Sequence, residues 1–166
     1  MKKAVFVVLF CLIIFTLCAG CGNQTAKQEQ TVAIGNPWSD WNSMEEAESA
    51  VGFSFGLPDV IADCYKVARI RTMSKELLEV VYCHESFEVY VRKQKGEGQD
   101  ISGDYNEYDT CAETNHNGVM ITTYQNTGNT ALRQMVSYKG YSWSLVAPSG
   151  YGGASDWDFV NKILEQ

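Results

Sequence analysis

The chain has 166 residues, with 13 basic and 20 acidic side chains and a formal net charge of −7. Phosphate backbones and anionic headgroups repel such a chain, which argues against nucleic-acid binding and against membrane attachment through a basic patch. This length accommodates one domain with a substantial core but not two.

The N-terminus has the pattern of an export signal. Lys2 and Lys3 precede an apolar run, Ala4–Leu17, which is short for a membrane-spanning helix. The small pair Ala19-Gly20 then leads into Cys21, and this arrangement resembles the bacterial lipobox, whose Cys sulfur receives a diacylglycerol. We therefore expect a signal peptide over residues 1–20 and a lipid on Cys21, which places the protein on the outer face of the cytoplasmic membrane.

A polar stretch rich in Gln, Thr and Asn follows Cys21. Its composition predicts a flexible tether over residues 21–36 and a single folded domain over residues 37–166. Without Lys2 and Lys3 the chain has 11 basic and 20 acidic residues, a formal charge of −9. The predicted lipid, with its two acyl chains, is therefore the expected membrane anchor.

The first regular element predicted in the domain is a short helix. Ser43 is a suitable N-cap, Glu46 completes the spacing of a capping box, and Gly52 is a natural stop. Apolar residues recur on one face at helical spacing, at Met44, Ala47, Ala50 and Val51.

Seven runs rich in Val, Ile, Thr and Tyr then predict an antiparallel meander. Asn117-Gly118 is the strongest of the turn signals between them. A second helix follows, with Ser155 as its cap and an apolar stripe that includes Phe159 and Ile163. The expected fold is α+β, with both helices packed on one face of the sheet. The predicted strands are Lys66–Met73, Glu76–Cys83, Phe87–Lys95, Tyr108–Asn115, Val119–Gln125, Ala131–Tyr138 and Tyr141–Val146.

Three cysteines remain after the signal and the lipidated residue: Cys64, Cys83 and Cys111. An exported chain permits one disulfide among them, and the sequence leaves three alternative pairings open beside three free thiols. Cys83 precedes His84, but neighbouring strand residues point to opposite faces, so we expect no nucleophile–base pair there.

Metal and cofactor motifs are weak. Cys83, His84, Cys111 and His116 lack a recognised zinc spacing, and we predict no cofactor. Oxygen-bearing side chains alternate at Asp100, Ser102, Asp104 and Asn106, but Tyr105 stands where an EF-hand requires Gly. A weak cation site on Asp100, Asp104 and Asp109 remains an alternative to a solvated turn.

Aromatic residues are numerous enough for a platform that stacks on sugars or peptides, but alternation in the last strand favours their burial. That strand places Tyr141 and Trp143 on the same face. The residues considered for such a platform are Trp38, Trp41, Tyr141, Trp143, Tyr151 and Trp157.

The chain contains the segment Asp100-Ile101-Ser102-Gly103-Asp104-Tyr105-Asn106, and several shorter motifs precede it. They are Asn36-Pro37-Trp38, Leu57-Pro58-Asp59 and Val91-Arg92-Lys93. Taken in chain order, these motifs resemble those of a family of small Gram-positive lipoproteins with an extracytoplasmic domain of unknown function. The resemblance implies export and a sheet-rich fold, and no established activity.

The leading hypothesis is a non-enzymatic module that binds a protein, peptide or other envelope component. Its expected surface is Asp100, Asp104, Tyr105 and Asp109, and Gly103 provides backbone freedom there. The alternatives are an envelope enzyme that uses Cys83 or Cys111, and a sensor of a small ligand or cation.

Overall fold

The computed structural model describes residues 35–127, 131–147 and 158–166, without the side chain of Asp158. Residues 36–166 form one compact unit. The predicted signal peptide, the lipidation site Cys21, most of the tether and the Ser155 cap lie outside the described residues. Among the described residues, no helix has the length and apolar character needed to cross a membrane.

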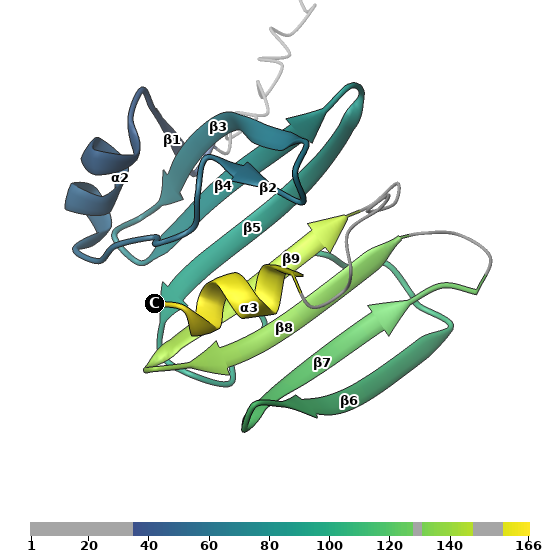
Figure 1. Ribbon diagram of the computed structural model, residues 1–166. Coiled ribbons are helices and arrows are strands. Elements are labelled where there is room, and N and C mark those ends of the chain that lie inside the picture. The colour runs from purple at the N-terminus through teal and green to yellow at the C-terminus, as the bar shows by residue number, and fades with distance from the viewer. Residues whose placement is uncertain (1–34, 128–130, 148–157) are drawn as a thin grey trace, which may run out of the picture. The chain divides into compact units, whose positions relative to one another are not determined.

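The described elements are nine strands and two helices, which confirms the predicted α+β fold. All named strand pairs are antiparallel, in the order β1-β3-β4-β5-β9-β8-β7-β6, and β2 also pairs with β3 (Figure 1). Their bounds are β1 (Trp38–Trp41), α2 (Met44–Val51), β2 (Val60–Ile61), β3 (Tyr65–Met73), β4 (Leu77–His84), β5 (Phe87–Lys95), β6 (Thr110–His116), β7 (Val119–Gln125), β8 (Leu132–Tyr138), β9 (Tyr141–Ala147) and α3 (Asp158–Leu164).

All seven predicted strands are present, and their ends lie within two residues of the predicted ones. β1 and β2 were not predicted, because neither has an alternating apolar pattern. β1 forms by pairing with β3, where Trp38 lies opposite Met73 and the Trp41 indole donates to Thr72 Oγ1 at 2.9 Å. Tertiary pairing therefore creates a strand that local sequence does not specify.

Helix α2 has the predicted ends. The N–H of Glu46 donates to Ser43 Oγ at 3.2 Å, which is the Ser43 half of the predicted capping box. Gly52 has a left-handed conformation, with φ of 72°, and its N–H donates to the Glu48 carbonyl at 2.8 Å. These two residues fix where the chain turns toward the sheet.

One face of the sheet carries the hydrophobic core, and we call it the covered face. Both helices and the segment 53–57 pack on it, and α3 lies over β8 and β9 (Figure 1). Val80, Val91 and Leu145, each without solvent exposure, lie opposite one another on three neighbouring strands. The prediction that both helices cover one face is thereby confirmed.

The chain does not pass from β5 to the neighbouring strand in sequence. β5 pairs with β9, whereas residues 96–109 run to β6 at the far edge of the sheet, and β6 to β9 then return to β5. We call residues 96–109 the crossing loop. The contacts described below place it on the face opposite the core, which we call the second face.

Candidate functional site

A straight row of polar side chains runs across the second face. The strand register places Arg71, Glu79, Arg92 and Ser144 side by side on β3, β4, β5 and β9. The row alternates positive and negative charge at its centre. A second row places Tyr90 beside Val146 and Val146 beside Arg133.

Glu79 is the centre of this charged row. Its carboxylate is fully buried and accepts hydrogen bonds from Arg71 Nε and, at 2.7 Å, from Arg92 Nε. The Trp38 ring covers both guanidinium groups, at 4.4 Å from Arg71 and 5.4 Å from Arg92. A buried carboxylate requires such partners, and in return it fixes the orientation of both arginines.

Two arginines from different strands hold the crossing loop by its backbone. Arg92 Nη1 donates to the Ile101 carbonyl at 3.1 Å, and Arg133 Nη1 donates to the Asp104 carbonyl at 2.8 Å. Between these anchor points Ile101 and Ser102 are buried against the sheet. The loop is therefore attached to the second face at both ends of its central segment.

The alternating oxygens of the loop form consecutive turns. The N–H of Ser102 donates to Asp100 Oδ1 at 3.0 Å, that of Asp104 to Ser102 Oγ at 3.3 Å, and that of Asn106 to Asp104 Oδ1 at 3.1 Å. Each polar side chain thus accepts from the backbone two residues further on. This pattern accounts for the spacing that resembled a calcium loop.

The environment of the loop shifts two pKa values. Burial by itself would raise the pKa of Asp100, but the hydrogen bonds from Ser102 and the charges of Arg133 and Arg92 outweigh it and hold this pKa below its usual range. Burial, with the hydrogen bond to Asp104, raises the pKa of Tyr108. Asp100 is thus an anion and Tyr108 a neutral donor at physiological pH.

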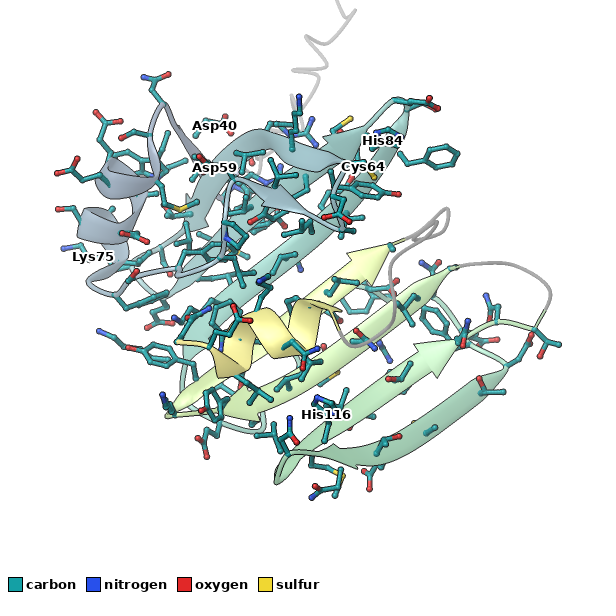
Figure 2. The ribbon with its side chains drawn as sticks, viewed as in Figure 1. Asp40, Asp59, Cys64, Lys75, His84 and His116 are labelled. Carbon is teal, nitrogen blue, oxygen red and sulfur yellow. The ribbon has the colours of Figure 1, made fainter. Side chains whose placement is uncertain are left out.

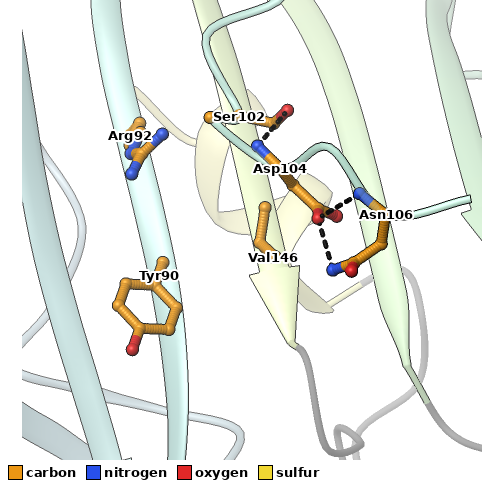
Figure 3. Close-up of a pocket in the computed structure, with 7 residues that line it drawn as sticks. Tyr90, Arg92, Ser102, Asp104, Asn106 and Val146 are labelled. Atoms are coloured by element: carbon orange, nitrogen blue, oxygen red, sulfur yellow. Dashed lines mark hydrogen bonds between the residues drawn. The ribbon is translucent and has the colours of Figure 1, made fainter.

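A pocket of about 250 Å³ lies between β5 and the crossing loop (Figure 3). A second hollow, of about 240 Å³, lies on the side of β7 and β8 and includes Met120 and Met135. The lining of the first pocket is Tyr90, Arg92, Ser102, Gly103, Asp104, Asn106 and Val146.

The four residues predicted as a binding surface have different positions. Tyr105 is 96% exposed, and Asp104 lines the pocket. Asp100 lies 3.8 Å from Arg133, and Asp109 Oδ2 accepts from the Thr127 N–H at 2.7 Å. The three carboxylates are not brought together, and the described part of the chain contains no group of three His, Cys, Asp or Glu suited to a metal.

Cys64, Cys83 and Cys111 are all free thiols, so the structure contains none of the three disulfides that the sequence permits among them. Cys83 Sγ donates to the Glu85 carbonyl at 3.4 Å, whereas the His84 ring lies 5.6 Å from the Tyr65 ring. The structure thus separates Cys83 from His84 as predicted.

His116 is engaged elsewhere, with its Nε2 2.9 Å from Asn161 Oδ1. Figure 2 shows Cys64 and His84 near one end of β4, and His116 well away from them. The four residues considered for zinc are not brought together, in keeping with the absence of a metal-suited group among the described residues.

Sequence reasoning missed Glu79 and assigned no role in a site to Arg92. A signal was present, because Glu79 is the single charged residue in the apolar strand β4 and both neighbouring strands carry an arginine. Comparison with protein-family models, with curated proteins and with solved structures gives no match.

The Gly103→Ala substitution is expected to lower the free energy of unfolding by about 2–3 kcal/mol. Gly103 has φ of +56°, and an added Cβ would lie 2.0 Å from Arg92 Nη1. That guanidinium is held by Glu79 and Ile101, so it moves only if a charged hydrogen bond breaks. Urea unfolding measures the loss.

Gly98→Ala is the matched control. Gly98 has φ of +75°, but nothing lies within 4 Å of an added Cβ. The Gly98→Ala variant is therefore expected to lose only the free energy of the backbone strain, about 1–2 kcal/mol. Equal losses for the two variants would show that Gly103 makes no close approach to Arg92.

Proposed function

We propose that the chain is a lipid-anchored, non-enzymatic binding module on the outer face of the cytoplasmic membrane, with its binding site at the pocket beside the crossing loop. One observation carries the site. Tyr105 lies between Asp104 and Asn106, which line the pocket, and is 96% exposed on a backbone segment that the sheet and its own turns hold in place. A large aromatic side chain on an ordered loop loses little conformational entropy on binding, which favours its use as a contact.

The chemistry of the pocket favours binding over catalysis. Its lining has no thiol, imidazole or amine, and Arg92 and Asp104 already engage other groups. A hydrogen bond to Glu88, together with burial, raises the pKa of Tyr90, so its phenol stays protonated at physiological pH. Proton transfer needs a group that titrates near the working pH. The thiol-enzyme alternative has less support, because Cys83 and Cys111 lie outside this pocket.

Site-specific photo-crosslinking in intact cells tests the proposed site. With a photoreactive residue in place of Tyr105, we expect a discrete adduct that a variant carrying the same residue at Phe87 does not give. Phe87 is a suitable control because it is also an exposed aromatic, at 40%, and lies at the start of β5, outside the crossing loop. Identical adducts at both positions, or none at Tyr105, would contradict the proposal.

The Cys21→Ala substitution tests the proposed anchor. A diacylglycerol on Cys21 supplies two acyl chains, and their loss removes stable membrane binding. We expect the variant to leave the membrane fraction, while the unchanged chain remains there. Fractionation followed by immunoblotting measures this, with Cys64→Ala as a control that keeps the anchor. Retention of the Cys21→Ala protein in the membrane would contradict lipid anchoring.

A further inference from the structure

We infer that the pocket beside the crossing loop binds one uncharged sugar ring, an inference that rests on the proposed function and specifies its ligand. The size of the pocket is the first argument. Its volume of about 250 Å³ lies below the roughly 300–1,000 Å³ of pockets that hold drug-sized ligands. That space suits a single ring or side chain, and is small for a larger ligand.

The charges around the pocket are the second argument. Arg92 is paired with Glu79, and the Asp104 carboxylate accepts from Asn106 Nδ2 at 2.6 Å and from the Tyr108 hydroxyl. Arg71 shares the Glu79 carboxylate with Arg92, so the formal charges of Arg71, Arg92, Glu79 and Asp104 sum to zero. An anionic or cationic ligand would lose its hydration in exchange for charged groups that already have hydrogen-bond partners, which disfavours a peptide terminus or a phosphate.

The hydrogen-bonding character of the lining is the third argument. Arg92 only donates, Asp104 only accepts, and Asn106 and Ser102 do both. A sugar hydroxyl is both donor and acceptor, so neighbouring hydroxyls match such a mixed set. Val146 and the Tyr90 ring add apolar surface for the C–H groups of a ring. The chemistry is the same for a free sugar and for a sugar unit of an envelope polysaccharide.

Saturation-transfer NMR on the full chain in detergent tests this inference. The probes are glucose, galactose, mannose and N-acetylglucosamine, compared with glucosamine and glucuronate, which carry a positive and a negative charge on the same kind of ring. We expect transfer to at least one neutral sugar at millimolar concentration, and binding of the charged rings weaker by about tenfold or more. Absence of transfer to every neutral sugar, or equal binding of the charged rings, would overturn the inference.

An Asn106→Ala variant locates the binding. Asn106 is exposed and lines the pocket, so we expect the fold to persist and transfer to fall about tenfold or more. The matched control is Thr114→Ala, an exposed polar residue on β6 outside the pocket. Unchanged transfer in the folded Asn106→Ala protein would place any sugar elsewhere and overturn the inference.

A pull-down with insoluble wall polysaccharide identifies the source. If the wall polysaccharide retains the protein and free sugar releases it, the natural ligand is a sugar unit of a polymer. If the protein binds free sugar but not the polysaccharide, the natural ligand is a soluble sugar. Either result supports binding of an uncharged sugar ring in the pocket. Protein adducts from Tyr105 without sugar binding would overturn the sugar inference and leave the proposed binding site intact.

Discussion

The Glu79→Leu chain is expected to lose about 3–5 kcal/mol of its free energy of unfolding. The substitution leaves Arg71 and Arg92, whose side chains are only 23% and 13% exposed, without the carboxylate between them. It also frees the guanidinium that holds the crossing loop at the Ile101 carbonyl. Urea unfolding followed by tryptophan fluorescence measures the loss, since Trp38 stacks on both arginines.

Glu88→Leu is the control for this prediction. Glu88 pairs with Arg69 on the second face as well, but the two side chains are 33% and 45% exposed. An exposed ion pair contributes about 1 kcal/mol or less. The burial of Glu79, rather than its charge alone, is thus the expected origin of the difference. Similar losses in the two variants would contradict this explanation.

The second large effect concerns Lys93, which is buried in the covered face. Its Nζ donates to the Ser54 carbonyl at 2.6 Å and lies 4.5 Å and 4.4 Å from the ring centres of Tyr141 and Trp143. Burial lowers the pKa of Lys93 to about 8 from its ordinary 10.5, against a smaller opposing effect of the Glu48 charge. The folded state therefore releases this proton more readily than the unfolded state.

Stability is expected to rise with pH between about 8 and 10. In this range the unfolded chain keeps the Lys93 proton and the folded chain loses it, so higher pH favours folding, by about 2 kcal/mol in all. Well below pH 8 both states are protonated and this contribution is constant. Tyr90 and Tyr108 act in the opposite direction, because their pKa values are raised by folding, but only above pH 10.

Lys93→Met isolates this contribution. The variant has no amine to titrate and keeps a side chain of similar length, so its free energy of unfolding is expected to change less over the same range. The difference between the two chains, measured by urea unfolding at several pH values, should grow by about 2 kcal/mol. Parallel pH profiles would show that Lys93 has an ordinary pKa in the folded state.

Local sequence patterns predict most of the helices and strands, but they do not predict which strands pair with one another. Composition and turn signals predicted β5 and β7 with their observed ends, and Ser43 and Gly52 set the ends of α2. The pairing of β5 with β9 has no local signal, because it depends on where the crossing loop leads the chain. β1 is likewise defined by its partner rather than by its own residues.

In the candidate site, too, the local features were visible in the sequence and the long-range contacts were not. The loop from Asp100 to Asn106 stood out in the sequence because its turns use side chains at fixed local spacing. Its partners Arg92 and Arg133 come from distant strands, and only the strand order brings them together. A lone glutamate in an apolar strand could have indicated a charged partner, but not which residue supplies it.

The consecutive turns of the crossing loop also affect its resistance to proteolysis. Proteases bind a substrate as an extended strand, through backbone groups that must be free. In this loop side chains already occupy the N–H groups of Gly98, Gln99, Ser102, Asp104 and Asn106. A long surface segment is thereby made a poor protease substrate, although its strand pairing is limited to the bridge between Gly96 and Tyr141 and no disulfide closes it.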